Sequence, residues 1–305
     1  MNENKTNPLL CDPVSGMCEM PSSETLNEKT IIKTENKPVK IIYYTDPICS
    51  SCWGIEPQLR KLKLEYGEYF EIDYRMGGLL PDWNYNSGGI SKPSDVAHHW
   101  DEASLYYEMP IDGNVWLEDP LDSSYPSCIA MKAAQIQSKE KAVGFMRILR
   151  EKLYLQKKNI AKWDNIAEAA ELADLDIEKL KKDYEIDAVK LFRDDLNLAK
   201  SLGVRGFPTL FFADENNNRL TIYGSKSYHS YEDALLALYP EAKKKKFENK
   251  NALSLFEVYP TLAPKEYAII QEISVNDASI ILEELFQKGK LDKKEIKNGT
   301  LYSIK

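Results

Sequence analysis

Residues 39–53 read Val39-Lys-Ile-Ile-Tyr-Tyr-Thr-Asp-Pro-Ile-Cys49-Ser-Ser-Cys52-Trp53, and this stretch decides the fold. Its first six residues are β-branched or aromatic apart from one lysine, which is typical of a buried strand. Apolar residues then recur at helical spacing from residue 55 to residue 66, and residues 70–76 alternate as a strand does. We therefore predict a β-α-β unit, whose crossover places the cysteines at the carboxyl end of the first strand, where open α/β sheets usually carry their chemistry.

The two cysteines stand at the predicted start of the helix, and this position favours thiol chemistry. Unpaired backbone N–H groups and the positive end of the helix dipole stabilise a thiolate there, which lowers the pKa of the first thiol. Cys49 is therefore predicted to be the outer, substrate-facing nucleophile. Cys52 follows one turn later and is predicted to resolve a mixed disulfide formed on Cys49.

A second stretch, residues 203–209 (Gly-Val-Arg-Gly-Phe-Pro-Thr), places a proline directly before an apolar strand. A cis bond at Pro208 would bring the backbone groups of Phe207 beside the dithiol, where they would pair with an extended substrate strand. The candidate catalytic residues are Cys49, Cys52 and Pro208. The candidate substrate-binding residues are Trp53, Phe207 and Thr209, with plain core packing as the alternative for Trp53.

The rest of the chain divides by composition and periodicity. Residues 1–37 are polar and are predicted to form a flexible tail; residues 38–240 form the main domain, with a helical insertion at about 93–203; residues 241–250 form a lysine-rich linker; residues 251–305 form a small unit. The small unit reads as helix, turn, helix and hairpin, a winged-helix-like order, with Ile296 expected opposite Leu301.

The overall composition limits the partners and the compartment. The 305 residues are 43% apolar and carry a net charge of −8, so no global field attracts nucleic acid or anionic lipid, and we expect neither as a partner. The first thirty residues hold no apolar run typical of a signal peptide, which predicts a cytoplasmic protein. In that compartment the five cysteines are more typical of redox, metal-binding or buried thiols than of structural disulfides.

Three cysteines lie outside the dithiol motif. Three interpretations are open for Cys11 and Cys18: a second redox pair that relays electrons to Cys49, idle tail cysteines, or half of a zinc site. Turn-forming residues between them would bring their sulfurs together. Cys128 reads as a small buried thiol. No bound cofactor and no metal site are predicted.

The strand, the C-x-x-C motif, the helical insertion and the later Gly-Val-x-Gly-x-Pro-Thr-Leu-Phe-Phe segment resemble the DsbA family of thioredoxin-fold proteins over residues 38–240. The segments 45–53, 112–116 and 124–135 are similar to a cytoplasmic branch that contains FrnE-like dithiol oxidoreductases and YjbH (SpxH) adaptors. Those adaptors bind the transcription factor Spx and promote its degradation by the ClpXP protease. Residues 265–274 resemble the adaptor side of the branch.

This resemblance implies an α/β thioredoxin fold with an inserted helical subdomain, followed by a winged-helix-like α+β unit. It implies two functions. The first is a thiol:disulfide oxidoreductase or isomerase that acts on protein disulfides through Cys49 and Cys52. The alternative is a YjbH-type adaptor that delivers an Spx-like client to ClpXP. The family motif usually holds Pro-His where this chain has Ser50 and Ser51, so a reducing or isomerising role fits better than strong oxidation.

Overall fold

The computed structural model describes residues 11–12, 17–19, 37–84, 91–247 and 251–305. The predicted flexible tail therefore lies mostly outside the described residues, as do residues 248–250 of the predicted linker. Within the described part, no helix is long and apolar enough to cross a membrane.

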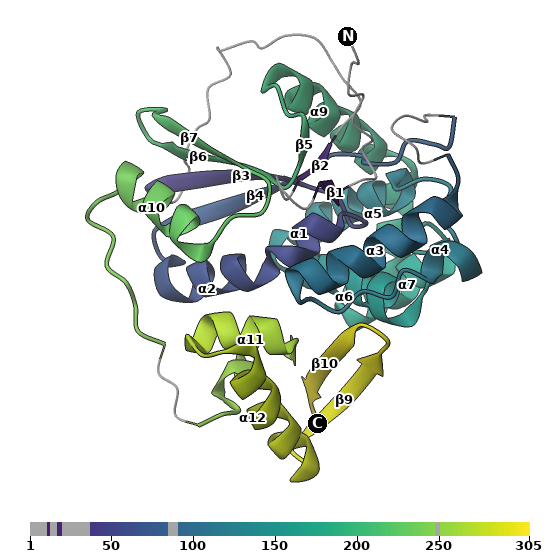
Figure 1. Cartoon of the computed structure of the whole chain (residues 1–305). Coiled ribbons are helices and arrows are strands. Elements are labelled where there is room, and N and C mark those ends of the chain that lie inside the picture. The colour runs from purple at the N-terminus through teal and green to yellow at the C-terminus, as the bar shows by residue number, and fades with distance from the viewer. Residues whose placement is uncertain (1–10, 13–16, 20–36, 85–90, 248–250) are drawn as a thin grey trace, which may run out of the picture.

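The centre of the fold is a four-stranded mixed sheet in the order β4-β3-β6-β7 (Figure 1). Its strands are β3 (Val39–Thr45), β4 (Phe70–Met76), β6 (Thr209–Asp214) and β7 (Arg219–Tyr223). β3 pairs in parallel with β4, and it pairs antiparallel with β6, which forms a hairpin with β7. The apolar runs at β3 and β6 form the middle of the sheet, so both of these strands are buried along nearly their whole length.

Helices cover both faces of this sheet. α2 (Glu56–Tyr66) and α10 (Tyr228–Leu238) pack against each other, and α10 contacts β6 and β7. α9 (Asp187–Ser201) contacts β4 from the other side and lies at the top of Figure 1. The arrangement is a sheet between two helical layers, as the β-α-β pattern of the sequence predicts.

The helical segment after the dithiol is divided into two helices at Ile55. α1 (Ser50–Gly54) ends before Ile55, and α2 begins at Glu56 with Pro57 in its first turn. A proline is tolerated there because the first-turn N–H groups have no partner inside the helix.

The predicted helical insertion lies between β4 and β6. Its helices are α3 (Pro93–Tyr107), α4 (Val115–Glu118), α5 (Tyr125–Gln137), α6 (Lys139–Gln156), α7 (Trp163–Leu172), α8 (Ile177–Glu185) and α9. Large buried side chains join the insertion to the sheet in one continuous core that includes Trp53, Trp100, Trp116, Phe145 and Tyr154. The short strand β5 (Gly206–Phe207) follows the insertion and precedes β6.

The C-terminal unit packs beneath α2 in Figure 1 and has a small core of its own. Its elements are the 3-10 helix η1 (Ser254–Glu257), β8 (Thr261–Leu262), α11 (Pro264–Gln271), α12 (Val275–Gln287), β9 (Leu291–Ile296) and β10 (Gly299–Ile304). This order matches the predicted helix, turn, helix and hairpin. The predicted register is wrong, however, because Ile296 lies opposite Gly299 and Leu301 lies opposite Lys294. The tip of the turn is Lys297 and Asn298, one residue earlier than the expected register requires, and it lies against the main body.

Candidate functional site: a buried dithiol and the edge strand beside it

The dithiol stands where the sequence places it, directly after the first strand of the sheet. β3 ends at Thr45, and Cys49 is the N-cap residue of α1. The backbone N–H of Cys52 donates to the Sγ of Cys49 over 3.1 Å, so the sulfur satisfies one of the N–H groups that the helix start leaves open. This geometry supplies the helix N-terminus on which the predicted thiol chemistry depends.

The prediction that Cys49 is the outer, exposed thiol is wrong, and its role as the nucleophile stays a prediction. Cys49 and Cys52 are thiols whose side chains are both 0% exposed. The helical insertion covers the start of α1, and the hydroxyls of Ser51 and Tyr107 are 2.8 Å apart across this contact. The N-terminal strand β2 (Met17–Glu19) also contacts α1. A helix N-terminus is exposed by default, and sequence periodicity carries no sign that two other segments cover this one.

The surroundings of the two thiols also reverse the order in which they are expected to ionise. Burial raises the pKa of the Cys49 thiol well above its ordinary value, and the hydrogen bond shared with Cys52 adds to this shift. For Cys52 burial acts in the same direction, but the hydrogen bond from Cys49 and the charge of Arg150 outweigh it and leave the pKa of Cys52 below its ordinary value. Negative charge in this pair is therefore favoured on the second sulfur.

Arg150 is a site residue that our reading of the sequence missed. It lies on α6 and is almost completely buried. Its guanidinium donates to Oε1 of Glu56 at 2.6 Å, to Oγ1 of Thr45 at 2.8 Å and to the carbonyl of Asp46 at 3.2 Å. Attraction by surrounding negative groups outweighs burial and keeps the pKa of Arg150 above its ordinary value, so a permanent cation lies beside the dithiol. The signal in the sequence was a basic residue among the apolar positions of α6. This signal is ambiguous, because an arginine whose charged end reaches the surface gives the same pattern.

Asp46 is a second buried charged residue in the loop before the dithiol. Its carboxylate accepts from the N–H groups of Ile48 and Leu79 at 3.0 and 2.7 Å, and from the Ser124 hydroxyl at 2.9 Å. The Cys128 thiol donates to it at 3.2 Å, which confirms the prediction that Cys128 is a buried thiol. Burial raises the pKa of Asp46 despite these four donors. Asp46 therefore fixes the loop that carries Cys49.

The edge predicted to receive an extended substrate strand is β5, and the chain's own N-terminal segment occupies it. The Phe207–Pro208 peptide bond is cis. β2 pairs antiparallel with β5, and Cys18 lies opposite Phe207. β2 also pairs with β1 (Cys11–Asp12), and Cys11 lies opposite Cys18. The structure thus brings the dithiol helix, the β5 edge and both tail cysteines around one strand, β2.

The three residues predicted to bind substrate have fully buried side chains. Trp53 donates from its indole N–H to the carbonyl of Pro110 at 3.2 Å, and the Thr209 hydroxyl donates to the carbonyl of Gly206 at 2.7 Å. The ring of Phe207 fills the space in which Gly77 lacks a side chain. These side chains stabilise the fold as it stands, and a role for them in substrate binding stays a prediction.

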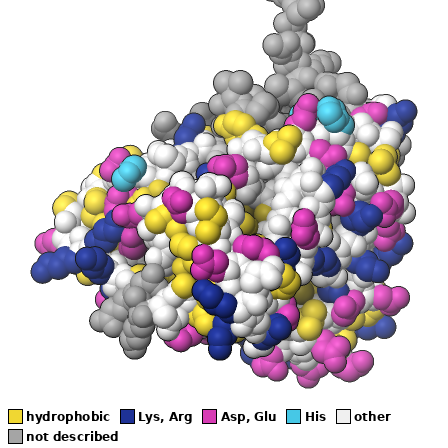
Figure 2. Space-filling model, turned by 60° about the horizontal axis from the view of Figure 1, so that its bottom comes forward, with side chains coloured by type: hydrophobic (Ala, Val, Ile, Leu, Met, Phe, Trp, Pro, Cys, Tyr) yellow, Lys and Arg dark blue, Asp and Glu magenta, His cyan; other side chains and the backbone are white. Residues whose placement is uncertain are grey.

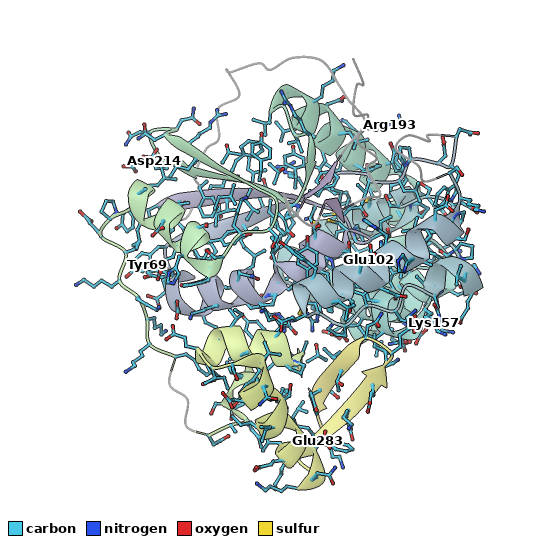
Figure 3. All side chains as sticks on the ribbon, viewed as in Figure 1. Tyr69, Glu102, Lys157, Arg193, Asp214 and Glu283 are labelled. Carbon is cyan, nitrogen blue, oxygen red and sulfur yellow. The ribbon has the colours of Figure 1, made fainter. Side chains whose placement is uncertain are left out.

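Two adjacent histidines, His98 and His99, lie on α3. The His98 ring is exposed, and ring nitrogens of His98 and His99 lie 3.2 and 3.4 Å from carboxylate oxygens of Glu102. Glu102 is labelled on α3 in Figure 3. Among the described residues, no group of three or more His, Cys, Asp or Glu side chains has the arrangement of a metal site.

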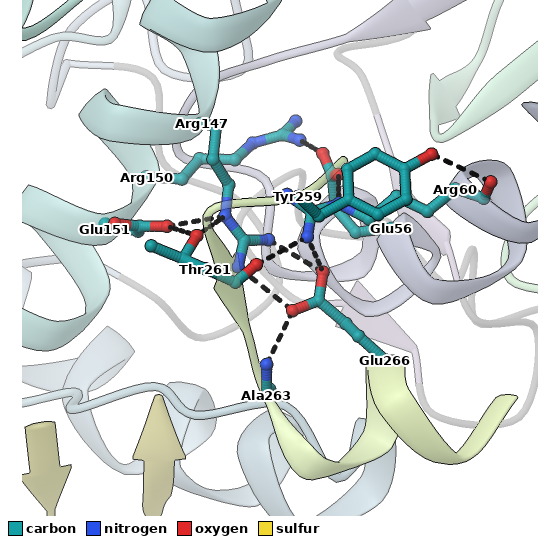
Figure 4. A network of polar contacts seen from close by, with 9 residues as sticks. All are labelled: Glu56, Arg60, Arg147, Arg150, Glu151, Tyr259, Thr261, Ala263 and Glu266. Atoms are coloured by element: carbon teal, nitrogen blue, oxygen red, sulfur yellow. Dashed lines mark hydrogen bonds and ion pairs between the residues drawn. The ribbon is translucent and has the colours of Figure 1, made fainter. Parts of the chain in front are cut away.

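A buried ionic network joins the main body to the C-terminal unit (Figure 4). Glu266 of α11 receives two hydrogen bonds from Arg147 of α6, at 2.9 and 3.0 Å, and its Oε1 lies 3.1 Å from the Arg60 guanidinium of α2. The backbone N–H of Ala263 completes its set of donors at 2.8 Å. Burial would raise the pKa of Glu266, but the charges of Arg147 and Arg60 hold it below its ordinary value.

The hairpin tip forms a second connection between the two parts. The amide of Asn298 donates to Oδ1 of Asp101 at 2.7 Å and to the carbonyl of Ile111 at 3.0 Å. Lys297 pairs with the same aspartate at 2.7 Å. Because both ends of the C-terminal unit are anchored in this way, it presents a fixed surface beside the main body. Figure 2 brings this unit forward and shows Lys and Arg interspersed with Asp and Glu over that face.

These features define a thioredoxin-fold protein of the DsbA-like type: the order of the sheet, the dithiol at a helix start, and the short strand β5 that precedes β6. The model of the Thioredoxin family matches residues 43–233. A protein described as a putative disulfide isomerase from Nitrosomonas europaea has a similar structure, with a TM-score of 0.56 and 20% identity over 67% of this chain and 97% of the other. The cytosolic disulfide reductase DsbM from Pseudomonas aeruginosa gives a TM-score of 0.52 and 19% identity over 66% and 98%.

Within that class, the chain belongs to the SpxH family. It is 34% identical to the ClpXP adapter protein SpxH of Halalkalibacterium halodurans over 99% of this chain and 98% of the relative. The SpxH of Bacillus subtilis is 32% identical over 87% and 89%. The likeness to the SpxH proteins therefore includes the C-terminal unit, whereas the solved structures cover about two thirds of the chain.

Proposed function

We propose that this protein is an adapter that binds a client protein and delivers it to the ClpXP protease. The observation that carries the proposal is the complete burial of Cys49, because attack on a protein disulfide needs an accessible thiolate. Similarity along the whole chain to relatives named as ClpXP adapters supports the same function. The client that we propose is an Spx-like transcription factor, and the proposed location is the cytoplasm.

The client surface that we propose is the groove between the main body and the C-terminal unit. This groove has a volume of about 500 Å³ and is lined by α2, β4, α6 and residues 258–261. Leu172, 64% exposed, and the half-exposed Val258 contribute apolar area to its wall. Exposed apolar side chains that border a groove are typical of protein-binding sites. The ionic network beneath the groove fixes its two walls relative to each other, which reduces the entropy lost on binding.

A degradation assay with purified ClpXP and an Spx-like client tests this proposal. Wild-type protein should accelerate loss of the client, and Leu172→Asp should abolish most of that acceleration by placing a charge in the groove. Leu105→Asp is the matched control, because Leu105 is 71% exposed on α3 and does not line the groove. No acceleration by the wild type would contradict the adapter function, and equal activity of the two variants would contradict the groove.

A second candidate function is thiol:disulfide exchange on protein substrates. The observation that favours it is the placement of Cys49 and Cys52 at the N-terminus of a helix that contacts β2, the strand paired with β5. Exchange with an outside substrate would require β2 to leave β5. Insulin reduction measures this activity: turnover that Cys49→Ser abolishes supports an enzyme, and the absence of turnover leaves the adapter as the function of the chain.

A further inference from the structure

Strand β2 is the element that joins the N-terminal cysteines to the dithiol. It is the middle strand of a three-stranded sheet in the order β1-β2-β5, and it contacts α1 (Figure 1). Its register is defined on both sides: Cys18 lies opposite Cys11 of β1 and opposite Phe207 of β5. An extended segment bound to an exposed strand edge is a common mode of peptide recognition.

The backbone placement also meets the distance requirement of disulfide chemistry. Opposed residues of an antiparallel pair have Cα atoms about 4.5–5.5 Å apart, and disulfides join Cα atoms about 4.4–6.8 Å apart. Cys11 and Cys18 are such a pair. β5 holds Cys18 next to the helix that Cys49 caps. Four cysteines therefore share one small region of the fold.

We propose that the N-terminal strand pair is an intramolecular substrate of the dithiol, with Cys18 as the residue that exchanges with Cys49. This inference does not depend on the adapter function. Burial of Cys49 from solvent is compatible with it, because the exchange partner belongs to the segment that covers the site. While β2 occupies β5, it also closes this edge to extended segments of other proteins.

The exchange proceeds in two balanced steps from a tail that carries a Cys11–Cys18 disulfide, formed by a low-molecular-weight disulfide. In the first step Cys49 reacts through the small fraction of thiolate that its raised pKa allows. This thiolate attacks the sulfur of Cys18, the Cys11–Cys18 bond breaks, and Cys11 leaves as a thiolate that takes up the proton lost by Cys49. In the second step the Cys52 thiolate attacks the sulfur of Cys49 and releases Cys18. Two electrons pass from the dithiol to the tail, and the two protons of the dithiol end on Cys11 and Cys18.

Two full-length variants trap the intermediate. Both carry Cys52→Ser, which removes the resolving thiol; one also carries Cys11→Ser and the other Cys18→Ser. Each is treated with oxidised glutathione and mapped by mass spectrometry without reduction. We expect a Cys18–Cys49 disulfide in the first variant, and at least about tenfold less Cys11–Cys49 disulfide in the second, because strand pairing raises the effective concentration of Cys18 alone. Circular dichroism checks that both variants are folded.

Each other outcome contradicts the proposal. Equal yields of the Cys11–Cys49 and Cys18–Cys49 disulfides would show that the pairing of Cys18 with Phe207 does not select the exchange partner. A Cys49 that carries only glutathione would show that Cys18 cannot reach it. A mixture of one variant that keeps only the tail cysteines with another that keeps only Cys49 should give no cross-linked dimer. A dimer formed as fast as the cross-link within one chain would contradict an intramolecular reaction.

Discussion

Arg147 and Glu266 form a bidentate ion pair across the contact between the main body and the C-terminal unit, and the Glu266 side chain is 0% exposed. The Arg147 guanidinium also lies 4.2 Å from the ring centroid of Trp53, the residue after Cys52. One side chain thus contacts both the C-terminal unit and the dithiol helix. The conformation of one part is therefore physically linked to the packing of the other.

Loss of the Glu266 carboxylate should weaken the fold strongly. Glu266→Ala leaves the buried Arg147 guanidinium without its main partner, and we expect the free energy of unfolding to fall by about 3–5 kcal/mol. Urea denaturation measures this change. Glu284→Ala is the control, because Glu284 forms an exposed pair with Lys288 and should cost less than about 1 kcal/mol. Equal effects of the two substitutions would contradict a stabilising role for the buried network.

The same carboxylate predicts a dependence of stability on pH. Its pKa is lowered in the folded protein, so its contribution is present above the pKa of the unfolded chain, about 4.3 for glutamate, and is lost as the pH falls through the folded value. The difference in unfolding free energy between wild type and Glu266→Gln should therefore be largest near neutral pH and should shrink below about pH 4. Denaturation curves recorded at several pH values test this, and a constant difference would contradict it.

Arg150 is predicted to control the ionisation of Cys52. Arg150→Met removes the cation that holds the pKa of Cys52 down, so this pKa should rise, whereas Arg150→Lys should retain part of the effect. The ultraviolet absorbance of the thiolate during a pH titration reports the change. A background in which the other four cysteines are replaced by serine assigns the signal to Cys52. An unchanged titration in Arg150→Met would show that the cation does not act on this thiol.

The burial of both thiols predicts slow reaction with thiol reagents. Reaction requires the covering segments to open, so alkylation of Cys49 in the native protein should be about 100-fold or more slower than in the urea-unfolded chain. Mass spectrometry of the labelled peptides measures each cysteine separately. Alkylation of native Cys49 at the unfolded rate would contradict a covered site.

Much of the architecture could be predicted because local patterns and global packing agree. The strand at residues 39–44, the cysteines at the next helix start and the proline before β6 each carry a specific local signal, and the structure places them as expected. The Ile296 register was predicted incorrectly because the hairpin tip is set by contacts of Asn298 with α3, which are distant in sequence.

The properties of the site were harder to predict because they depend on contacts between distant segments. Cys49 is buried by the insertion and by β2, and the residues around the motif contain no sequence signal of either contact. Arg150 and Glu266 lie 94 and 210 residues from Glu56 along the chain, so single-sequence patterns could not pair them with residues near the dithiol. The available signal was a charged residue at an apolar position of a predicted helix, and this signal does not identify the residue with which Arg150 or Glu266 pairs.

The function of the chain can be tested most directly by a variant that lacks both thiols of the motif. Cys49→Ser combined with Cys52→Ser should accelerate ClpXP degradation of an Spx-like client as well as the wild type does, because we propose that the groove, and not the dithiol, binds the client. Loss of that acceleration in a folded double variant that still binds ClpXP would contradict this proposal and assign the delivery step to thiol chemistry.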